Sequence, residues 1–296
     1  MNKCISLING EFKDSISVLD RGLSYGDGFF ETMIWQFGNK KDKHLFGVEF
    51  WKRHLRRIKT SCKLTKINLP NSKLLARYRK KILFKAHLEG LSEGILKIIV
   101  TRGVGGRGYK FEKKMMSTVI FLVFPKPVID ERFYERGATV RYCKSSLSQN
   151  RELFGLKHLN RLDSVMARAE WNEGFFEGVF LDHKSNLIEG TMTNIFFVKN
   201  KTLHTPPIMG SGIDGIMRKV VIEKARLFFD DIKITNVNKK NLEKYDEMFL
   251  TNSVIKIMPV KSLGKKKFNI SDQTKELIDF FHIENKIEKD NRLEFF

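Results

Sequence analysis

The stretch "GLKHLNRLDSVMARAE", residues 155–170, decides how the rest of the chain is interpreted. It places Lys157 directly before a segment whose apolar residues recur at helical spacing, namely Leu162, Val165, Met166 and Ala169. A lysine is almost always a solvated surface charge. A lysine in a partly apolar site has a second use, because the loss of solvation favours the neutral amine that can form a Schiff base. The remainder of the sequence has to decide between these two interpretations.

The composition is that of an ordinary globular protein. The 296 residues suffice for two domains or one large one, and 42% are hydrophobic. No run approaches the roughly 18 apolar residues of a membrane span, and "MNKCISLINGEFKD" turns polar too early for a signal peptide. Cys4, Cys62 and Cys143 are odd in number and widely spaced, which argues against a disulfide framework or a metal site. We therefore expect a cytoplasmic protein without a structural metal.

The charge is strongly basic, with 54 lysines and arginines against 34 acidic residues and a net charge of +20. Such a balance is typical of nucleic-acid-binding proteins. However, the positive residues are spread along the chain, and we find no zinc-ligand spacing or helix-turn-helix pattern. Scattered lysines also attract small anions and speed their encounter with a protein. We expect a small anionic substrate, and neither a nucleic acid nor a membrane as partner.

The first part of the chain predicts a small domain of strands and helices, residues 1–124. Short apolar runs predict strands within 4–10, 15–18, 94–103 and 117–124. Helical periodicity predicts helices over 46–64 and over 71–90, the second with Asn71 as its cap. "PKPVID" opens the best candidate linker, residues 125–136.

A larger domain is predicted over residues 137–296. Strands are expected at 138–144, several times between 177 and 206, at 247–252 and at 256–260. Helices are expected at 160–174, 215–229 and 274–289, the last leading into a charged tail. Strands grouped with a few helices, without strict alternation, indicate the α+β class.

Four stretches offer groups that suit a phosphorylated, electron-withdrawing cofactor. Lys157 supplies an amine, and Glu189 in "NLIEGTMTNIFF" supplies a carboxylate, although a carboxylate on a strand is more often solvent-facing. Gly212 and Gly215 precede a helix that begins near Ile216, where backbone N–H groups can bind an anion. Arg57 in "RHLRRIK" can grip a phosphate, although neighbouring arginines make that signal weak on its own. Together the four predict pyridoxal 5'-phosphate as the cofactor.

Seven segments, in order, resemble those of fold-type IV pyridoxal-phosphate enzymes, the class of the branched-chain and D-amino-acid aminotransferases. They run from residue 5 to about 260: "LINGE", "DRGLSYGDGFFET", "LKIIVTRGVGGRGY", "GLKHLNRLDSVMARAE", "LIEGTMTNIFF", "GIDGIMRK" and "DEMFLTNSVIKIMPV". Within the class, "RGVGGRGY" and "GLKHLNRL" are most similar to the 4-amino-4-deoxychorismate lyases. The resemblance implies a two-domain α+β architecture like that of D-amino-acid aminotransferase, and a homodimer.

The resemblance also assigns cofactor roles to individual residues. Lys157 matches the Schiff-base lysine, which also serves as general acid and base, and Glu189 matches the partner of the pyridine nitrogen. The matches for the phosphate group are Arg57, in a pattern with His54, the backbone amides of Ile216 and Met217, and the hydroxyl of Ser253.

Substrate contacts are expected from two other stretches. Arg107 in "GGRGY" is the first choice for a substrate carboxylate and Arg102 the second, with Tyr109 beside them. Phe30 and Thr32 share a face of a strand, where they are expected to touch substrate, and Glu31 between them points away. Because Phe30 lacks the tyrosine hydroxyl that the D-amino-acid aminotransferases tend to place there, D-amino-acid transamination is disfavoured. His158, beside the lysine, is assigned to packing around the site.

These matches imply a lyase of folate biosynthesis that converts 4-amino-4-deoxychorismate to 4-aminobenzoate and pyruvate. A branched-chain or D-amino-acid aminotransferase on the same scaffold is the alternative, since it shares every cofactor residue. A nucleic-acid-binding protein that has kept an enzyme-like scaffold is the third hypothesis.

Overall fold

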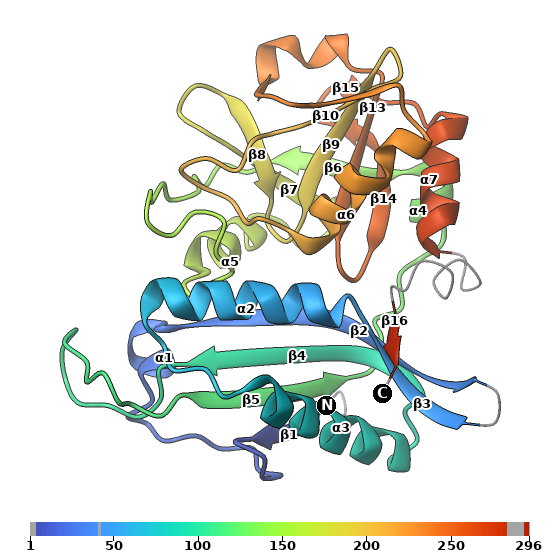
Figure 1. Cartoon of the computed structure of the whole chain (residues 1–296). Coiled ribbons are helices and arrows are strands. Elements are labelled where there is room, and N and C mark those ends of the chain that lie inside the picture. Colours follow the sequence, from blue (N-terminus) through green and yellow to red (C-terminus); the bar gives the residue numbers. More distant parts are fainter. Residues whose placement is uncertain (1–3, 41–42, 283–292, 296) are drawn as a thin grey trace. The chain divides into compact units, whose positions relative to one another are not determined.

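The computed structural model describes residues 4–40, 43–282 and 293–295 of the chain, which forms two compact units (Figure 1). Unit 1 comprises Met1–Val128, Lys157–Asn160 and Ile287–Phe296, and unit 2 comprises Ile129–Leu156 and Arg161–Lys286. None of the helices within the described ranges is long and apolar enough to cross a bilayer.

The division differs at two places from the predicted domains, because Lys157–Asn160 and the C-terminal strand Leu293–Phe295, both predicted within the 137–296 domain, belong to unit 1. The chain first passes from unit 1 to unit 2 between Val128 and Ile129, inside the predicted 125–136 linker. Lys157–Asn160, assigned to the C-terminal domain by the sequence, belongs instead to unit 1. The reason is local, because its backbone hydrogen-bonds to strand β2 (Gly28–Lys40).

Unit 1 is built on a six-stranded antiparallel sheet with the strand order β1-β5-β4-β2-β3-β16. Besides β2, its strands are β1 (Ile5–Ile8), β3 (Lys43–Glu49), β4 (Glu93–Thr101), β5 (Thr118–Phe124) and β16 (Leu293–Phe295). Side chains alternate between the two faces of a strand. The face of β2 that carries Met33 and Trp35 is fully buried, and their neighbours Phe30 and Thr32 are only partly covered.

Three helices accompany this sheet: α1 (Arg21–Tyr25), α2 (Trp51–Thr65), which packs on β2, and α3 (Ser72–Leu88), which packs on β1 and β5. The predicted cap of α3 is confirmed, since Asn71 Oδ1 accepts a hydrogen bond from Leu74 N at 2.9 Å. The helix predicted over 46–64 starts later, because β3 occupies the residues before Phe50, whose φ is 52° at the turn.

The strand predicted at 15–18 is wrong. Ile16 is 37% and Val18 78% exposed, and no strand in the described part of the chain includes these residues. Strand β1, which precedes them, lies at the edge of the sheet and pairs with β5. Apolar alternation without a neighbouring strand therefore does not produce a strand here.

Unit 2 contains a ten-stranded mixed sheet with the order β11-β10-β9-β13-β14-β6-β7-β8-β12 and β15 paired with β14. The pairs β6–β14, β6–β7 and β10–β11 are parallel. The strands are β6 (Ala138–Tyr142), β7 (Glu177–Leu181), β8 (Asn186–Gly190), β9 (Asn194–Lys199), β10 (Thr202–Thr205), β11 (Asp231–Ile234), β12 (Val237–Asn238), β13 (Glu247–Asn252), β14 (Lys256–Leu263) and β15 (Lys266–Lys267). Buried aromatic side chains fill the sheet's core, and the rings of Phe196 and Phe249 stack at 5.0 Å.

The helices of unit 2 are α4 (Arg132–Arg136), α5 (Leu162–Arg168), α6 (Ile216–Lys224) and α7 (Asp272–His282), with short 3-10 turns η1 (Ala225–Leu227) and η2 (Lys239–Lys244). The predicted helices are present, but α5 is shorter than 160–174, and part of the 274–289 prediction lies outside the described residues. The apolar stripe on α5 is not packed: Leu162, Val165 and Met166 are 75%, 59% and 61% exposed.

Candidate functional site

Lys157 lies on a short segment that continues the unit 1 sheet beside the start of β2. Phe30 N donates to Lys157 O at 3.0 Å, and Leu159 N donates to Gly28 O at 3.0 Å. Between these bonds, His158 forms a bridge with Phe29. The backbone of the predicted nucleophile is therefore held by sheet hydrogen bonds, as part of a rigid element.

The Lys157 amine lies over the half-buried aromatic ring of Phe30. Phe30 and Thr32 share one face of β2, and the strand register places Ile99 and Lys97 of β4 on that same face. Lys157 Nζ lies 4.4 Å from the centroid of the Phe30 ring, and Lys97 Nζ lies 5.1 Å from it. Burial lowers the pKa of Lys97. Two amines therefore share one phenyl ring in unit 1.

Lys97 is not among the residues predicted from the sequence, because residues 94–103 indicate only a buried strand. A usable signal was present: Lys97 is the one charged residue in the apolar run "ILKIIV". A lysine that interrupts such a run lies on a face that has to accommodate an ammonium group.

Arg57 is held by a buried carboxylate on the opposite face of β2. Glu31 Oε1 accepts from Arg57 Nε at 2.7 Å, and Glu31 Oε2 accepts from Arg57 Nη2 at 2.6 Å. His54 Nδ1 lies 2.6 Å from the same Oε2. Burial alone would raise the pKa of Glu31, but the charges and hydrogen bonds of Arg57 and His54 lower it to about 2. The predicted phosphate arginine therefore sits in a charge network that fixes its orientation, and Glu31 points away from Phe30 as expected.

Glu189, on β8 of unit 2, is a buried carboxylate, only 5% exposed. Its Oε2 accepts a hydrogen bond from Ile213 N at 2.8 Å and lies 3.3 Å from Asn194 Nδ2. Asn194 Nδ2 also donates to Ile213 O at 2.9 Å. Both neighbours fix the orientation of the carboxylate, which suits a partner for a cationic ring nitrogen.

Two arginines near Glu189 were not singled out by the sequence analysis. Burial lowers the pKa of Arg161, and the nearby Glu189 and Asp163 oppose that effect. Burial likewise lowers the pKa of Arg218, and the negative charges of Asp214 and Glu189 oppose that effect. In the sequence both arginines resemble ordinary helix charges, so only the fold reveals that they lie within electrostatic range of a buried carboxylate.

The start of α6 is shaped for an anion. Its cap residue is Gly215, so no side chain caps the helix, and a Cβ there would overlap Asn194 Oδ1. The side chains of Ile216 and Met217 are 4% and 1% exposed. Only their backbone amides can therefore meet a phosphate, which is the role that the sequence predicts for them.

Ser253 lies in the turn between β13 and β14. Asn252 shapes this turn, because its Oδ1 accepts from Val254 N at 2.8 Å and Ile255 N at 2.9 Å. Its Nδ2 donates to Met192 O at 3.2 Å and so ties the turn to the residues that follow β8. A phosphate contact from the half-buried Ser253 stays a prediction.

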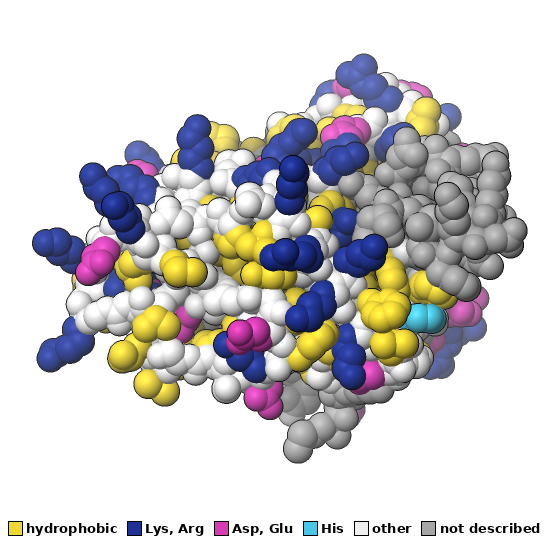
Figure 2. Space-filling view, turned by 60° about the horizontal axis from the view of Figure 1, so that its bottom comes forward, with side chains coloured by type: hydrophobic (Ala, Val, Ile, Leu, Met, Phe, Trp, Pro, Cys, Tyr) yellow, Lys and Arg dark blue, Asp and Glu magenta, His cyan; other side chains and the backbone are white. Residues whose placement is uncertain are grey.

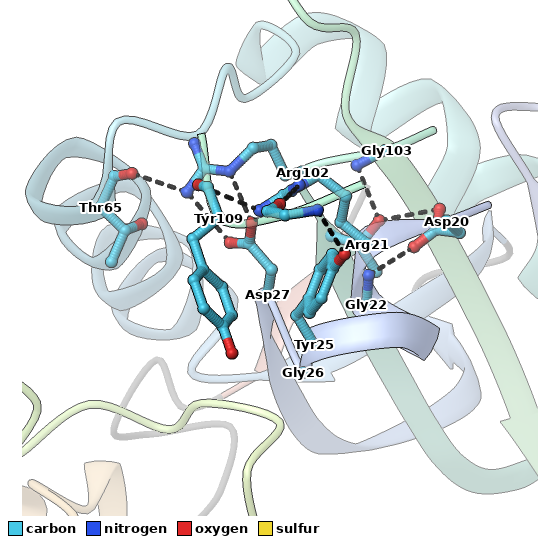
Figure 3. Close-up of polar contacts among 12 residues, drawn as sticks. Asp20, Arg21, Gly22, Tyr25, Gly26, Asp27, Thr65, Arg102, Gly103 and Tyr109 are labelled. Carbon is cyan, nitrogen blue, oxygen red and sulfur yellow. Dashed lines mark hydrogen bonds and ion pairs between the residues drawn. The ribbon is translucent and has the colours of Figure 1, made fainter. Parts of the chain in front are cut away.

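The two arginines predicted to meet substrate differ in their surroundings. Arg107 is exposed, as is Tyr109 close to it. Arg102 is only 5% exposed and donates to Asp27 and to the carbonyls of Thr65 and Lys66, at 2.7 to 3.0 Å (Figure 3). The prediction for Arg102 is therefore corrected: its donors are used inside unit 1, where it supports the fold.

Within the described ranges, no group of three or more histidine, cysteine or acidic side chains is arranged to hold a metal ion.

Comparisons with known proteins identify the family of the chain. The family model of amino-transferase class IV matches residues 28–263. An aminodeoxychorismate lyase of Vibrio harveyi is 30% identical over 275 residues, 91% of this chain and 97% of the relative. A Methanocaldococcus jannaschii protein provisionally named branched-chain-amino-acid aminotransferase is 31% identical over 283 residues, 93% of this chain and 94% of the relative. The crystal structure of 4-amino-4-deoxychorismate lyase from Pseudomonas aeruginosa matches with a TM-score of 0.83 at 33% identity, over 95% of this chain and 99% of that one. The chain belongs to the class IV amino-transferase family, with the α+β fold of the fold-type IV pyridoxal-phosphate enzymes.

Proposed function

We propose that the protein is a lyase that converts 4-amino-4-deoxychorismate to 4-aminobenzoate and pyruvate, a step of folate biosynthesis. The observation that carries this proposal is the Phe30 surface, where Lys97 accompanies the Lys157 amine. The substrate has two carboxylates, and Lys97 and Arg107 of unit 1 supply two cations for them. The names of the Vibrio and Pseudomonas relatives support the same activity.

Pyridoxal 5'-phosphate is the cofactor of this family. When bound, it supplies an aldehyde that condenses with amines and a protonated ring that accepts electrons from the neighbouring carbon. Lys157 would be the amine that holds the cofactor, and Glu189 would keep the ring nitrogen protonated. Arg57, Ser253 and the first backbone amides of α6 would hold the phosphate.

The reaction then needs one proton transfer at the substrate. Once the substrate amine has taken its place at the cofactor aldehyde, Lys157 is a free amine, and it would remove the proton from the ring carbon that bears the amine. The bond between the neighbouring ring carbon and the enolpyruvyl oxygen breaks, and the departing group takes up a proton to become pyruvate. The remaining ring is aromatic 4-aminobenzoate, so the atoms of the substrate are fully accounted for. Thr32 and Tyr109 are the further residues that we expect to line the substrate.

A branched-chain or D-amino-acid aminotransferase is the second candidate, supported by the name of the Methanocaldococcus relative. The two activities share the cofactor residues and differ in what meets the substrate. Phe30 argues against D-amino acids, because a phenyl ring cannot donate a hydrogen bond to a carboxylate.

We also infer a homodimer that works in the cytoplasm and binds no nucleic acid. The exposed apolar stripe of α5, Leu162, Val165 and Met166, supports a second copy of the chain as partner. On the face shown in Figure 2, lysine and arginine side chains stand scattered among apolar and acidic ones. A duplex or RNA strand is bound by a continuous basic stripe instead.

The decisive experiment supplies the purified, cofactor-loaded protein with 4-amino-4-deoxychorismate and measures 4-aminobenzoate and pyruvate. Appearance of both supports the lyase. Turnover of a branched-chain amino acid with 2-oxoglutarate, without 4-aminobenzoate, establishes the aminotransferase instead. Lys157→Ala should abolish either activity. The variant should also lack the absorbance of the lysine-bound cofactor, which borohydride reduction should change in the wild type.

The role of Lys97 gives a sharper test. Loss of a hydrogen-bonded charge pair to one substrate carboxylate predicts a roughly 10- to 100-fold lower kcat/KM for Lys97→Met. Lys126→Met is the matched control, because Lys126 is an exposed lysine that pairs with Glu93 at 2.9 Å on the same unit. Equal kcat/KM values for the two variants would show that Lys97 does not bind the substrate.

A further inference from the structure

The geometry points to Arg21 and Tyr25 as positioning residues that hold the glycine-rich loop 104–109 in the conformation that presents Arg107 to substrate. This inference rests on the proposed function, because it assumes that Arg107 meets a substrate carboxylate. Neither Arg21 nor Tyr25 has to touch the substrate: both act through the loop. Figure 3 shows the contacts concerned.

The loop has a composition that favours mobility. Gly103, Gly105, Gly106 and Gly108 surround Arg107, and the φ angles of Gly103 and Gly108 are 93° and 82°. Glycine loses more conformational freedom on ordering than any other residue. A loop of this kind holds one conformation only when other groups fix it.

Arg21 fixes the loop through its backbone and its side chain. Its N–H donates to Gly103 O at 2.9 Å, and its Nη1 donates to Gly108 O at 2.9 Å. Its Nη2 lies 3.4 Å from Tyr109 O. The Arg21 guanidinium therefore grips the carbonyls of the two residues that follow Arg107. Hydrogen bonds from a charged donor are stronger than neutral ones.

Tyr25 holds the same peptide from its other side. Gly108 N donates to Tyr25 Oη at 2.9 Å, so that both polar groups of Gly108 are engaged. The ring of Tyr25 lies 4.7 Å from the Arg21 guanidinium and 5.7 Å from the ring of Tyr109, edge to face. Arg107 is therefore followed directly by a clamped residue.

A buried charge cluster anchors the clamp. Asp27 Oδ2 accepts from Arg21 Nε at 3.0 Å and from Arg102 Nε at 2.7 Å. Arg102 in turn reaches the carbonyls of Thr65 and Lys66 near the end of α2. The Arg21 side chain is 4% exposed, so its orientation is set by these partners and by packing. The same carboxylate thus connects the loop to the helix that carries Arg57.

The test uses the cofactor-loaded protein and two variants. Tyr25→Phe removes one hydroxyl and keeps the ring, and Arg21→Lys keeps the charge but cannot reach Asp27 and both carbonyls together. Backbone hydrogen exchange in the peptide that covers 104–110 should become about fivefold faster in Tyr25→Phe and roughly 10- to 100-fold faster in Arg21→Lys. Tyr78→Phe is the matched control, because its hydroxyl makes a comparable bond to Asn9 O at 3.0 Å elsewhere in unit 1. In Tyr78→Phe, backbone hydrogen exchange over residues 104–110 should be as fast as in the wild type.

Turnover then shows whether the clamp serves substrate binding. We expect Tyr25→Phe to raise KM for 4-amino-4-deoxychorismate about fivefold with kcat changed less than about twofold, since a ground-state contact is weakened. In an Arg107→Met background the same change should leave KM where it was, because Tyr25 acts through Arg107.

Two results would overturn the inference: unchanged loop exchange in both variants, or a KM effect of Tyr25→Phe that persists without Arg107. Failure of the proposed function looks different, because the wild type would then release no 4-aminobenzoate. In that case the exchange rates still decide whether Arg21 and Tyr25 hold the loop.

Discussion

Replacing Glu31 by glutamine should reveal how strongly the buried network around Arg57 stabilises unit 1. The substitution keeps the shape of the side chain and removes the charge that Arg57 grips at 2.6 and 2.7 Å. The neighbouring cations lower the pKa of Glu31 from 4.5 to about 2, which corresponds to roughly 3 kcal/mol of stability at about pH 7. Removing one partner of a buried ion pair typically costs about 3–5 kcal/mol, so the two estimates agree.

The pH dependence provides a signature of this mechanism. A carboxyl group whose pKa is lowered by folding contributes fully above its unfolded pKa, here 4.5, and loses that contribution as the pH falls toward about 2. The stability difference between wild type and Glu31→Gln should therefore fall from roughly 3 kcal/mol at about pH 7 to about half of that at about pH 3.

Urea unfolding followed by circular dichroism at several pH values measures this difference. Glu93→Gln is the matched control, since Glu93 forms an exposed pair with Lys126 on the same sheet and should change stability by less than about 1 kcal/mol. A loss below about 1 kcal/mol for Glu31→Gln, or a difference that does not vary with pH, would refute the argument. If Arg57 grips the cofactor phosphate as proposed, affinity for pyridoxal phosphate should also fall by roughly 10-fold or more, measured by absorbance titration.

Two further predictions concern unit 2. Glu189→Gln should retain the cofactor but lower kcat by about 100-fold or more, because an amide does not keep the ring nitrogen protonated; turnover and the absorbance of the bound cofactor test this, and an unchanged kcat would contradict it. Gly215→Ala should weaken binding of pyridoxal phosphate, because the added methyl group overlaps Asn194 Oδ1 at the start of α6. Gly106→Ala is the control, because nothing lies within 4 Å of the added atom there and its φ is not positive; equal cofactor affinities of the two variants would contradict the prediction.

The sequence predicted the elements whose signal is local. Helix α3 has both a regular apolar face and the Asn71 cap, β5 is an apolar run, and β4 is an apolar run interrupted by Lys97, so their assignment needed no knowledge of the rest of the fold. The 15–18 segment shows the limit of this reasoning. Its alternation resembles that of a strand, but pairing depends on a neighbour that residues far away in the sequence have to supply.

The candidate site likewise contains residues that the sequence predicts and residues whose role depends on the fold. Lys157, Glu189, Arg57 and the start of α6 were predicted because each offers a group that suits the cofactor, and the resemblance then assigned each of them a role. Lys97 escaped notice because its significance depends on the register between β2 and β4, which places it over the Phe30 ring. Arg102 was misjudged for the opposite reason, since an arginine beside a glycine-rich loop gives no sign in the sequence that Asp27 has already engaged it.

Lys157–Asn160 belongs to unit 1 but lies in the sequence between two stretches of unit 2, and this affects how the protein folds during synthesis. A fragment that ends at Val128 would leave Phe30 N and Gly28 O without the partners that Lys157 O and Leu159 N provide. On the ribosome, the N-terminal half has to wait for more than half of the polypeptide before the start of β2 has these partners, and for Leu293–Phe295 before β3 pairs with β16. The predicted nucleophile is thus added to a sheet most of whose strands have already been synthesised. Folding of the first half of the chain therefore depends on synthesis of the second half.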